Sequence, residues 1–134
     1  MRLTFQAKSC NEALARMTVA AFLTPLNPTL EELADTKTAV SEAVTNAIIH
    51  GYGETEGTVE LWCARRGREV WFHVKDTGNG IADIKAAMEP MYTTKPEQER
   101  SGMGFSFMEA FTDELIVESA VGEGTLVKMK KVMG

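Results

Sequence analysis

The stretch SEAVTNAIIHGYG, residues 41–53, decides how this chain folds, because as a helix it carries different chemistry on its two faces. At about 100° per residue, one face is an apolar stripe. The stripe consists of Val40, Val44, Ala47 and Ile48, and Leu30 and Leu33 extend it upstream. The opposite face carries Thr38, Glu42, Thr45, Asn46, Ile49 and His50. That second face has one carboxylate, an amide and an isoleucine but no lysine, which is unusual for a helix face in water. We therefore expect it to lie against a bound ligand.

Composition narrows the class of protein. The chain has 134 residues, of which 44% are hydrophobic, so we expect one domain spanning residues 1–134 with a substantial core. Its 14 basic and 19 acidic residues give a net charge of −5. An acidic chain without a basic run is a poor candidate for direct binding of nucleic acid or of a membrane surface.

The ends and the cysteines indicate a cytoplasmic protein. No apolar stretch approaches the roughly 18 residues of a membrane-spanning helix, and the first 16 residues contain no signal-peptide core. Cys10 and Cys63 lack the spacing of a metal site. We therefore expect two reduced thiols.

The first half of the chain is predicted to form a strand and two helices. Alternation of Leu3, Phe5 and Ala7 predicts a half-buried strand over residues 2–7. Residues 9–12, SCNE, have the spacing of a capping box and open a helix that ends near residue 23, before a proline. Its inward stripe is predicted to be Ala13, Leu14, Met17 and Ala21. Residues 29–32, TLEE, repeat the capping-box pattern and open the long helix, which ends near Gly51.

The second half is predicted to be mostly strands. Alternating patterns at residues 59–63 and 70–74 flank a turn around Gly67 and predict a hairpin. A short helix at 82–88, a loop at 90–102 and a helix at 102–112 follow, and strands at 115–119 and 125–132 close the chain. This order predicts a two-layer α+β sandwich, with a mixed, mostly antiparallel sheet of about five strands and helices on one face.

Glu42 and Asn46 lie four residues apart, so their side chains meet one helical turn apart. A carboxylate can accept a proton, and an amide oxygen is a hard ligand that suits Mg²⁺. The alternative interpretation is a polar pair on a wet surface.

The motif DTGNGI, residues 76–81, follows a predicted strand. An ionised Asp76 is an acceptor that can fix the amino group of a base, and glycines 78 and 80 let a flat ring approach the backbone. The motif lacks the strand–helix phosphate fingerprint of a dinucleotide fold, and an ordinary glycine turn is the alternative.

Two further segments complete the pattern. In TTKPEQERSGMGFSF, residues 93–107, the cations Lys95 and Arg100 precede a glycine-rich helix start, where free N–H groups favour phosphate. It is not a Walker A motif, because the G-K-[ST] ending is absent. In GEGT, residues 122–125, Thr125 can place a hydroxyl beside Asp76, although a simple hairpin turn has the same pattern. Together the four features predict a nucleotide site.

These motifs, in this order, resemble the ATPase superfamily of gyrase, Hsp90, histidine kinases and MutL. The stretches SEAVTNAIIHGY and TTKPEQERSGMGF are similar to one branch, the anti-sigma F factor family of serine kinases from sporulating bacteria. Residues 53–75 match least, being rich in tryptophan and arginine.

The resemblance implies roles for individual residues. Glu42 would be the general base and Asn46 the Mg²⁺ ligand. Asp76 would hold the adenine amino group, with Gly78, Gly80 and Thr125 around it. The remaining nucleotide-binding residues it implies are Thr94, Lys95, Arg100, Ser101, Gly102, Met103 and Gly104.

The resemblance also implies partners. The family binds sigma F and stops it joining RNA polymerase, and it uses ATP and Mg²⁺ to phosphorylate a serine of an anti-anti-sigma factor. ATP and ADP are its nucleotides, and it acts as a homodimer. Its first helix contributes to partner binding, which singles out Arg16, four residues after Glu12. A surface ion pair is the alternative interpretation of that pair.

Two other functions remain open at this point. A histidine-kinase catalytic domain would need a phospho-acceptor histidine, and neither His50, at the end of the nucleotide helix, nor His73, inside a strand, suits that role. An ATP-binding regulatory module without kinase activity would keep the pocket and make Glu42 dispensable.

Overall fold

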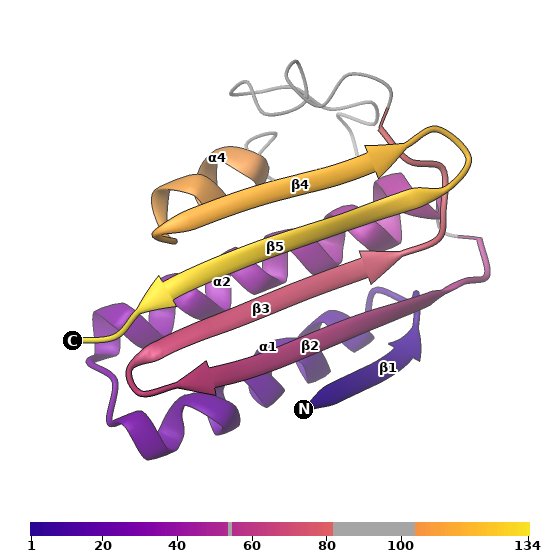
Figure 1. Cartoon of the computed structure of the whole chain (residues 1–134). Helices are drawn as coiled ribbons and strands as arrows, with labels where there is room; N and C mark the ends of the chain where they lie inside the picture. Colours follow the sequence, from indigo (N-terminus) through magenta and orange to yellow (C-terminus); the bar gives the residue numbers. More distant parts are fainter. Residues whose placement is uncertain (54, 82–103) are drawn as a thin grey trace.

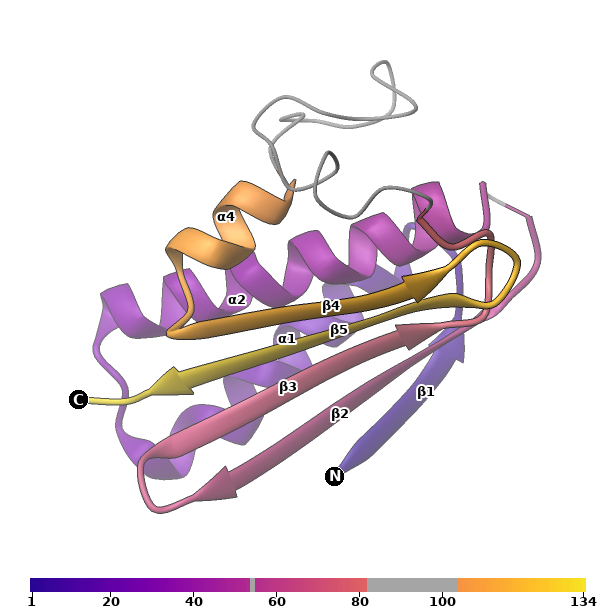
Figure 2. The same cartoon turned by 45° about the horizontal axis from the view of Figure 1, so that its top comes forward.

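A five-stranded sheet with helices on one face makes up the computed structural model, which describes residues 1–53, 55–81 and 104–134 (Figure 1). The strand order is β1-β2-β3-β5-β4, and the second view shows the helical layer behind the sheet (Figure 2). The strands are β1 (Arg2–Gln6), β2 (Thr58–Arg66), β3 (Glu69–Asp76), β4 (Glu114–Ala120) and β5 (Gly124–Val132). The helices are α1 (Asn11–Leu23), α2 (Leu30–Asn46) and α4 (Gly104–Ala110), with short turns η1 (Thr24–Leu26) and η2 (Ala47–Gly51).

The predicted α+β two-layer fold is confirmed, and the sheet is more regular than expected. Every pairing between described strands is antiparallel, so the parallel component of a mixed sheet is missing from this part of the chain. The predicted helix at 82–88 and loop at 90–102 lie outside the described residues.

Alternation along the strands separates the core from the open face of the sheet. In β3, Val70, Phe72 and Val74 are buried under the helices, while Trp71 and His73 point to the open face. Gly67 adopts φ 61° in the predicted hairpin turn between β2 and β3, a backbone conformation that glycine enters without penalty. Cys63 packs in the core as a small apolar group, and burial raises the pKa of its thiol to about 11.

Helix α1 turns a different face inward from the one the sequence predicts. Its buried residues are Ala15, Val19 and Leu23. The predicted inward stripe of Ala13, Leu14, Met17 and Ala21 is exposed instead. Leu14 and Met17 are 47% and 63% exposed, so this prediction is wrong. The helix has two apolar rows, and the row of Ala15, Val19 and Leu23 packs on the core.

The two predicted capping boxes have opposite outcomes. At the start of α2, the Thr29 hydroxyl accepts from the Glu32 backbone N–H at 3.0 Å, and the Glu32 carboxylate accepts from the Thr29 N–H at 2.9 Å. This box is confirmed. At the start of α1 the N-cap is Cys10, which makes no side-chain capping bond. The Glu12 carboxylate is instead bonded by the Ser41 hydroxyl of α2, so the box predicted at residues 9–12 is wrong.

The apolar stripe of α2 is largely as predicted. Val40, Val44, Ala47 and Ile48 are all buried, and Leu33 packs partly against the core. Leu30 is the exception at 87% exposure, because it is the first helical residue and lies beyond the edge of the core. The helix does not stop as an α-helix but continues through the π-helical turn η2 as far as Gly51.

Candidate functional site

Asp76 lies at the end of β3, on the side of the sheet that faces the helices, and is 6% exposed. Its Oδ1 accepts a hydrogen bond from the Gly78 N–H at 2.9 Å, and the register places it directly opposite Thr125 of β5. Burial raises the pKa of the Asp76 carboxyl, and hydrogen bonds from the backbone of Gly78 and Thr125 oppose part of that rise. Burying an ionised carboxylate in this way costs free energy, and a further hydrogen-bond donor would reduce that cost.

Glycines allow three chain segments to meet around this carboxylate. A Cβ on Gly51 would lie 3.0 Å from the Asp76 Cγ, and one on Gly78 would lie 2.0 Å from the Gly51 carbonyl oxygen. A Cβ on Gly124 would lie 2.2 Å from the Asp76 carbonyl oxygen. The Asn79 N–H donates to the Gly51 carbonyl at 2.6 Å, which ties the glycine motif to the end of the helix. A side chain at position 78 or 124 would overlap backbone, and one at position 51 would crowd the Asp76 carboxyl.

Thr125 is held in a small hydroxyl network beside Asp76. Its Oγ1 lies 2.8 Å from the Ser119 Oγ, and the Ser119 Oγ also accepts from the Ile81 N–H at 2.7 Å. Gly80, with φ 75°, sits where a Cβ would lie 2.0 Å from the carbonyl oxygen of Ala120. The four sequence-predicted positions Asp76, Gly78, Gly80 and Thr125 are thus brought together at one end of the sheet.

Glu42 and Asn46 are half-buried side chains one turn apart on α2. Gly51, five residues after Asn46, contacts the Asp76 carboxyl, so the helix ends at the same end of the sheet as the glycine motif (Figure 1). Ile49 is buried, and α4 packs along α2. The second face of the helix is therefore partly covered by protein rather than solvated. The π-helical turn η2 begins directly after Asn46 and ends at Gly51, and such turns are common at functional sites.

Several predicted positions cannot be placed against this geometry. Thr94, Lys95, Arg100, Ser101, Gly102 and Met103 lie outside the described residues. Gly104 is the first residue of α4.

Three contributors to the site are absent from the sequence prediction. The sequence predicts Gly51 only as a helix stop and Gly124 only as a turn residue, yet both lie against Asp76. Tyr52 bonds the backbone of Thr77 and Thr58. In the sequence, only the repeated glycines of HGYG and GEG could have indicated these contributors. The residues that they contact belong to segments distant in sequence.

Arg16 lies on the outward face of α1, far along the chain from the glycine motif. Its Nε is 3.7 Å from the Glu12 carboxylate, as the i, i+4 spacing predicts. Leu14 and Met17 are exposed apolar side chains of the same helix, two residues and one residue away in sequence and turned to other sides of it. This combination of a cation and apolar side chains has the composition of a protein-binding surface.

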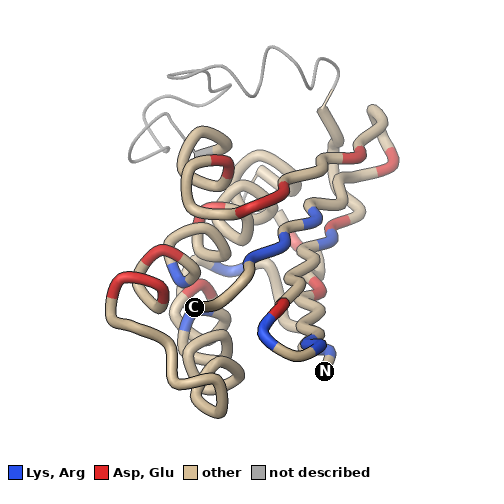
Figure 3. Tube along the Cα trace, turned by 60° about the vertical axis from the view of Figure 1, so that its left-hand side comes forward, with Lys and Arg blue, Asp and Glu red and all other residues tan. Residues whose placement is uncertain are grey.

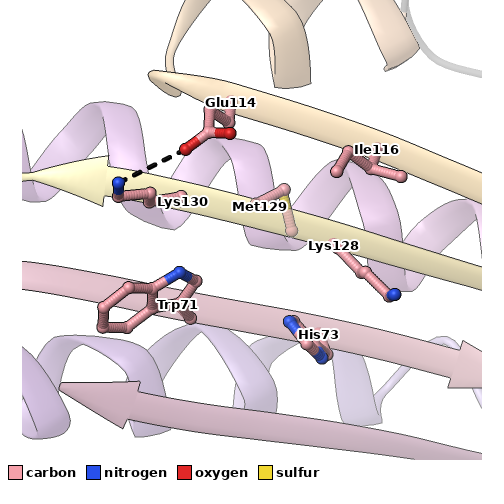
Figure 4. A pocket seen from close by; sticks show the side chains of 7 residues that line it. All are labelled: Trp71, His73, Glu114, Ile116, Lys128, Met129 and Lys130. Carbon is pink, nitrogen blue, oxygen red and sulfur yellow. Dashed lines mark ion pairs between the residues drawn. The ribbon is translucent and has the colours of Figure 1, made fainter.

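The open face of the sheet has a shallow hollow of about 300 Å³ between β3, β5 and β4 (Figure 4). It is lined by Trp71, His73, Glu114, Ile116, Lys128, Met129 and Lys130. Its lysines are already paired, since Lys128 bonds Glu118 at 2.9 Å and Lys130 bonds Glu114 at 3.3 Å. Acidic and basic residues alternate across neighbouring strands in this region (Figure 3). No sequence-predicted site residue lines the hollow.

The described residues contain neither a membrane-spanning helix nor a side-chain cluster for a metal ion. None of their helices combines the length and apolar character needed to cross a bilayer. Within residues 1–53, 55–81 and 104–134 there is also no cluster of three or more His, Cys, Asp or Glu side chains that could hold a metal ion.

Comparison with known proteins gives the chain relatives along nearly its full length. Residues 5–131 match the family described as the histidine kinase-like ATPase domain. An anti-sigma F factor of Clostridium kluyveri is 57% identical over 132 residues, covering 98% of this chain and 93% of that protein. An anti-sigma F factor of Thermoanaerobacter sp. strain X514 is 54% identical over 134 residues, covering 100% of this chain and 94% of that protein.

A solved structure shares the fold at much lower identity. The crystal structure of the RsbU and RsbW domains of a Mycobacterium tuberculosis protein matches with a TM-score of 0.70 and 20% identity, over 99% of this chain and 31% of that one. The family match and the full-length relatives establish more than fold: this chain belongs to the anti-sigma F factor family, within the histidine kinase-like ATPase domain family.

Proposed function

We propose that this protein is an anti-sigma factor that binds sigma F and blocks its association with RNA polymerase. We further propose that it is a Mg-ATP-dependent serine kinase that phosphorylates and so inactivates an anti-anti-sigma factor. The observation that carries the proposal is the buried Asp76 carboxylate, held among Gly51, Gly78 and Gly124 at the end of the helix that bears Glu42 and Asn46. The 57% identity to an anti-sigma F factor supports the choice of partners.

Recognition of the base is assigned to the β3–β5 end of the sheet. The ionised Asp76 carboxylate can only accept hydrogen bonds, so it pairs with the adenine amino group, which donates one. Because Asp76 is buried, that bond forms in a region of low dielectric and discriminates strongly against a base without the amino group. Gly78, Gly80 and Thr125 surround the ring.

The phosphates are assigned to the α2 face and to the segment leading into α4. Asn46 suits Mg²⁺, since its side-chain amide oxygen is a hard donor, and the half-buried position limits the water around it. When bound there, Mg²⁺ would neutralise the charge of the ATP phosphates and help to orient them. Thr94, Lys95, Arg100, Ser101, Gly102, Met103 and Gly104 are proposed to hold the remaining phosphate oxygens in the ATP and ADP states.

Glu42 is proposed as the base for the attacking serine. Phosphoryl transfer depends mainly on positioning and charge stabilisation, and the serine hydroxyl needs an acceptor only as its proton leaves. Glu42 lies one turn before Asn46 on the same face of α2, so the base and the metal ligand are fixed on one rigid element.

The outward face of α1 is proposed as the surface for protein partners. Arg16 supplies a fork of N–H donors for a partner carboxylate, and the exposed Leu14 and Met17 supply apolar area elsewhere on the same helix. We propose that the protein acts as a cytoplasmic homodimer on sigma F and on the anti-anti-sigma factor, without contacting nucleic acid or membrane.

The test is a phosphorylation assay with the matched pair of wild type and Glu42→Gln. Each protein is incubated with labelled ATP, Mg²⁺ and the anti-anti-sigma factor of the same organism, and phosphoserine is identified in the acceptor. Wild type should label a serine, and Glu42→Gln should bind ATP normally but transfer about 10²-fold more slowly or worse.

Two results would contradict the kinase proposal. Equal transfer rates in both proteins would remove Glu42 as the base. ATP binding without any labelling by wild type would leave a nucleotide-binding anti-sigma module without kinase activity, which sigma F binding in the same preparation would identify.

A further inference from the structure

The phenol of Tyr52 joins three segments that are distant in sequence. Tyr52 directly follows η2 and is 9% exposed. Its hydroxyl donates to the carbonyl of Thr58, at the start of β2, at 2.6 Å. It accepts from the backbone N–H of Thr77, just after β3, at 2.8 Å, and lies 3.2 Å from the Thr77 Oγ1. One donor and two acceptor positions are thus all used.

The aromatic ring of Tyr52 packs closely against Gly57. A Cβ on Gly57 would lie 2.4 Å from the Cδ1 and Cε1 of Tyr52. Gly57 is not among the glycines with positive φ, so its backbone conformation is open to other residues. The ring of Tyr52, rather than the backbone, is therefore what excludes a side chain at position 57.

The bond to Thr77 fixes the peptide that carries the base-binding carboxylate. The Thr77 nitrogen belongs to the Asp76–Thr77 peptide unit, and the Asp76 carboxylate bonds the Gly78 N–H two residues on. Holding the Thr77 N–H on the phenol therefore sets the plane of the turn in which the carboxylate sits. The backbone N–H of Tyr52 also bonds the Ala47 carbonyl at 3.1 Å, so the same residue closes the π-helical turn of the nucleotide helix.

We propose that Tyr52 is a positioning residue for base recognition: its hydroxyl aligns the Asp76–Thr77 turn with the end of α2, so that the Asp76 carboxylate meets the amino group of adenine. This rests on the proposed role of Asp76 in nucleotide binding. A residue that only packs would affect every nucleotide equally. A positioning residue affects the amino group specifically.

The experiment compares ADP with inosine diphosphate, which carries a carbonyl oxygen in place of the amino group. Calorimetric dissociation constants are measured for wild type, Tyr52→Phe and Asp76→Asn. Tyr52→Phe keeps the ring against Gly57 and removes only the hydroxyl. It should weaken ADP binding by about 5-fold to 10-fold, the usual effect of one hydrogen bond, and leave the inosine diphosphate affinity within about 2-fold.

Two further variants separate positioning from folding. Gly57→Ala should displace the ring and lower the preference for ADP in the same way, although position 57 is not in the proposed pocket. Thr58→Ala is the matched control, because the carbonyl of Thr58 rather than its side chain accepts the phenol bond. It should retain the wild-type preference. Hydrogen exchange of the Thr77 amide should speed up in Tyr52→Phe and not in Thr58→Ala.

The outcomes distinguish the two proposals. An unchanged ADP preference in both Tyr52→Phe and Gly57→Ala would overturn the positioning role, as would an equal loss of affinity for the two nucleotides. If wild type showed no preference for ADP, or if Asp76→Asn kept it, the proposed role of Asp76 itself would fail. If Tyr52→Phe did not fold, the Gly57→Ala ratio would decide between support and rejection.

Discussion

The buried Asp76 carboxyl lowers the stability of the folded protein when it is ionised. Burial raises its pKa above the ordinary value of 3.8. Because the folded pKa exceeds the unfolded one, ionised Asp76 costs stability at pH values above the folded pKa, and that cost vanishes as pH falls below 3.8. In the proposed function, the amino group of a bound adenine donates to the carboxylate and compensates this cost.

The first prediction follows from that linkage. In the free protein, the Asp76 carboxyl should titrate above 3.8, and adding ADP should lower its pKa because the donor favours the ionised form. ADP affinity should therefore fall as pH is lowered through the free-protein pKa. Carboxyl carbon NMR titrations with and without ADP measure both values, and the resonance missing from Asp76→Asn provides the assignment. An Asp76 pKa that ADP leaves unchanged would remove the carboxylate from the pocket.

The second prediction concerns Gly78, where a methyl group meets backbone. Gly78→Ala places a Cβ 2.0 Å from the Gly51 carbonyl oxygen, so the segments must separate and the Asn79 bond to that oxygen is strained. We expect a loss of about 1–3 kcal/mol in the free energy of unfolding, measured by urea denaturation. Gly67→Asn is the control, because its Cβ meets nothing within 4 Å and asparagine tolerates positive φ. Equal stability of both variants would mean that the helix end and the glycine motif are not in close contact.

Local sequence predicted part of this residue-scale picture. The positions of Asp76, Gly78 and Thr125 follow from a motif after a strand and from the register of a neighbouring strand. Gly51 and Tyr52 could not be found in the same way, because their importance depends on contacts with residues more than 20 positions away.

At the scale of elements, α1 illustrates the limit of periodicity. Ala13, Leu14, Met17 and Ala21 form one apolar row, and Ala15, Val19 and Leu23 form another. Helical spacing is satisfied by both rows, and the choice is made by packing against α2 and the sheet. By contrast, α2 has one dominant stripe and a complete capping box, and both were predicted correctly. Its π-helical end was not, since no local residue pattern marks that change of hydrogen bonding.

The third prediction tests the orientation of α1. Leu23→Ala removes a fully buried side chain and should cost about 2–5 kcal/mol in the free energy of unfolding. Met17→Ala removes a side chain that is 63% exposed and should change stability by about 0.5 kcal/mol or less. Chemical denaturation of the two variants measures the difference. A larger loss for Met17→Ala would restore the inward stripe that the sequence predicted.

At the scale of the whole molecule, the proposed nucleotide site and the proposed partner surface on α1 lie on different parts of one fold. The glycine motif and the end of α2 meet at one end of the sheet, whereas Arg16 lies on the outward side of α1. The order of elements predicted this layered fold because antiparallel hairpins and amphipathic helices leave few alternatives. Among the described residues, the Ser41 hydroxyl of α2 bonds the Glu12 carboxylate, which also pairs with Arg16, so Arg16 is connected to the helix that bears Glu42 and Asn46.

The last prediction belongs to this scale, because it asks whether the two surfaces act independently. Arg16→Ala should weaken binding to sigma F, and to the anti-anti-sigma factor, by more than about 10-fold, or about 1.4 kcal/mol. Arg16 itself is exposed, its Nε lies 3.7 Å from the part-buried Glu12 carboxylate, and Glu12 keeps its bond from Ser41, so the melting temperature should stay near that of wild type. ADP affinity should also be unchanged, because Asp76 and its glycines contact neither residue of the pair.

Binding is measured by calorimetry or surface plasmon resonance against each partner, with Arg66→Ala as the control for loss of one exposed arginine elsewhere. Arg16→Lys separates charge from geometry, since lysine keeps the charge but not the forked donors. Unaltered sigma F binding in folded Arg16→Ala would reduce the Arg16–Glu12 pair to a surface ion pair. A parallel loss of ADP affinity would instead show that the Glu12–Ser41 bond transmits changes from α1 into the helix that carries Glu42, so that partner and nucleotide binding are coupled through α2.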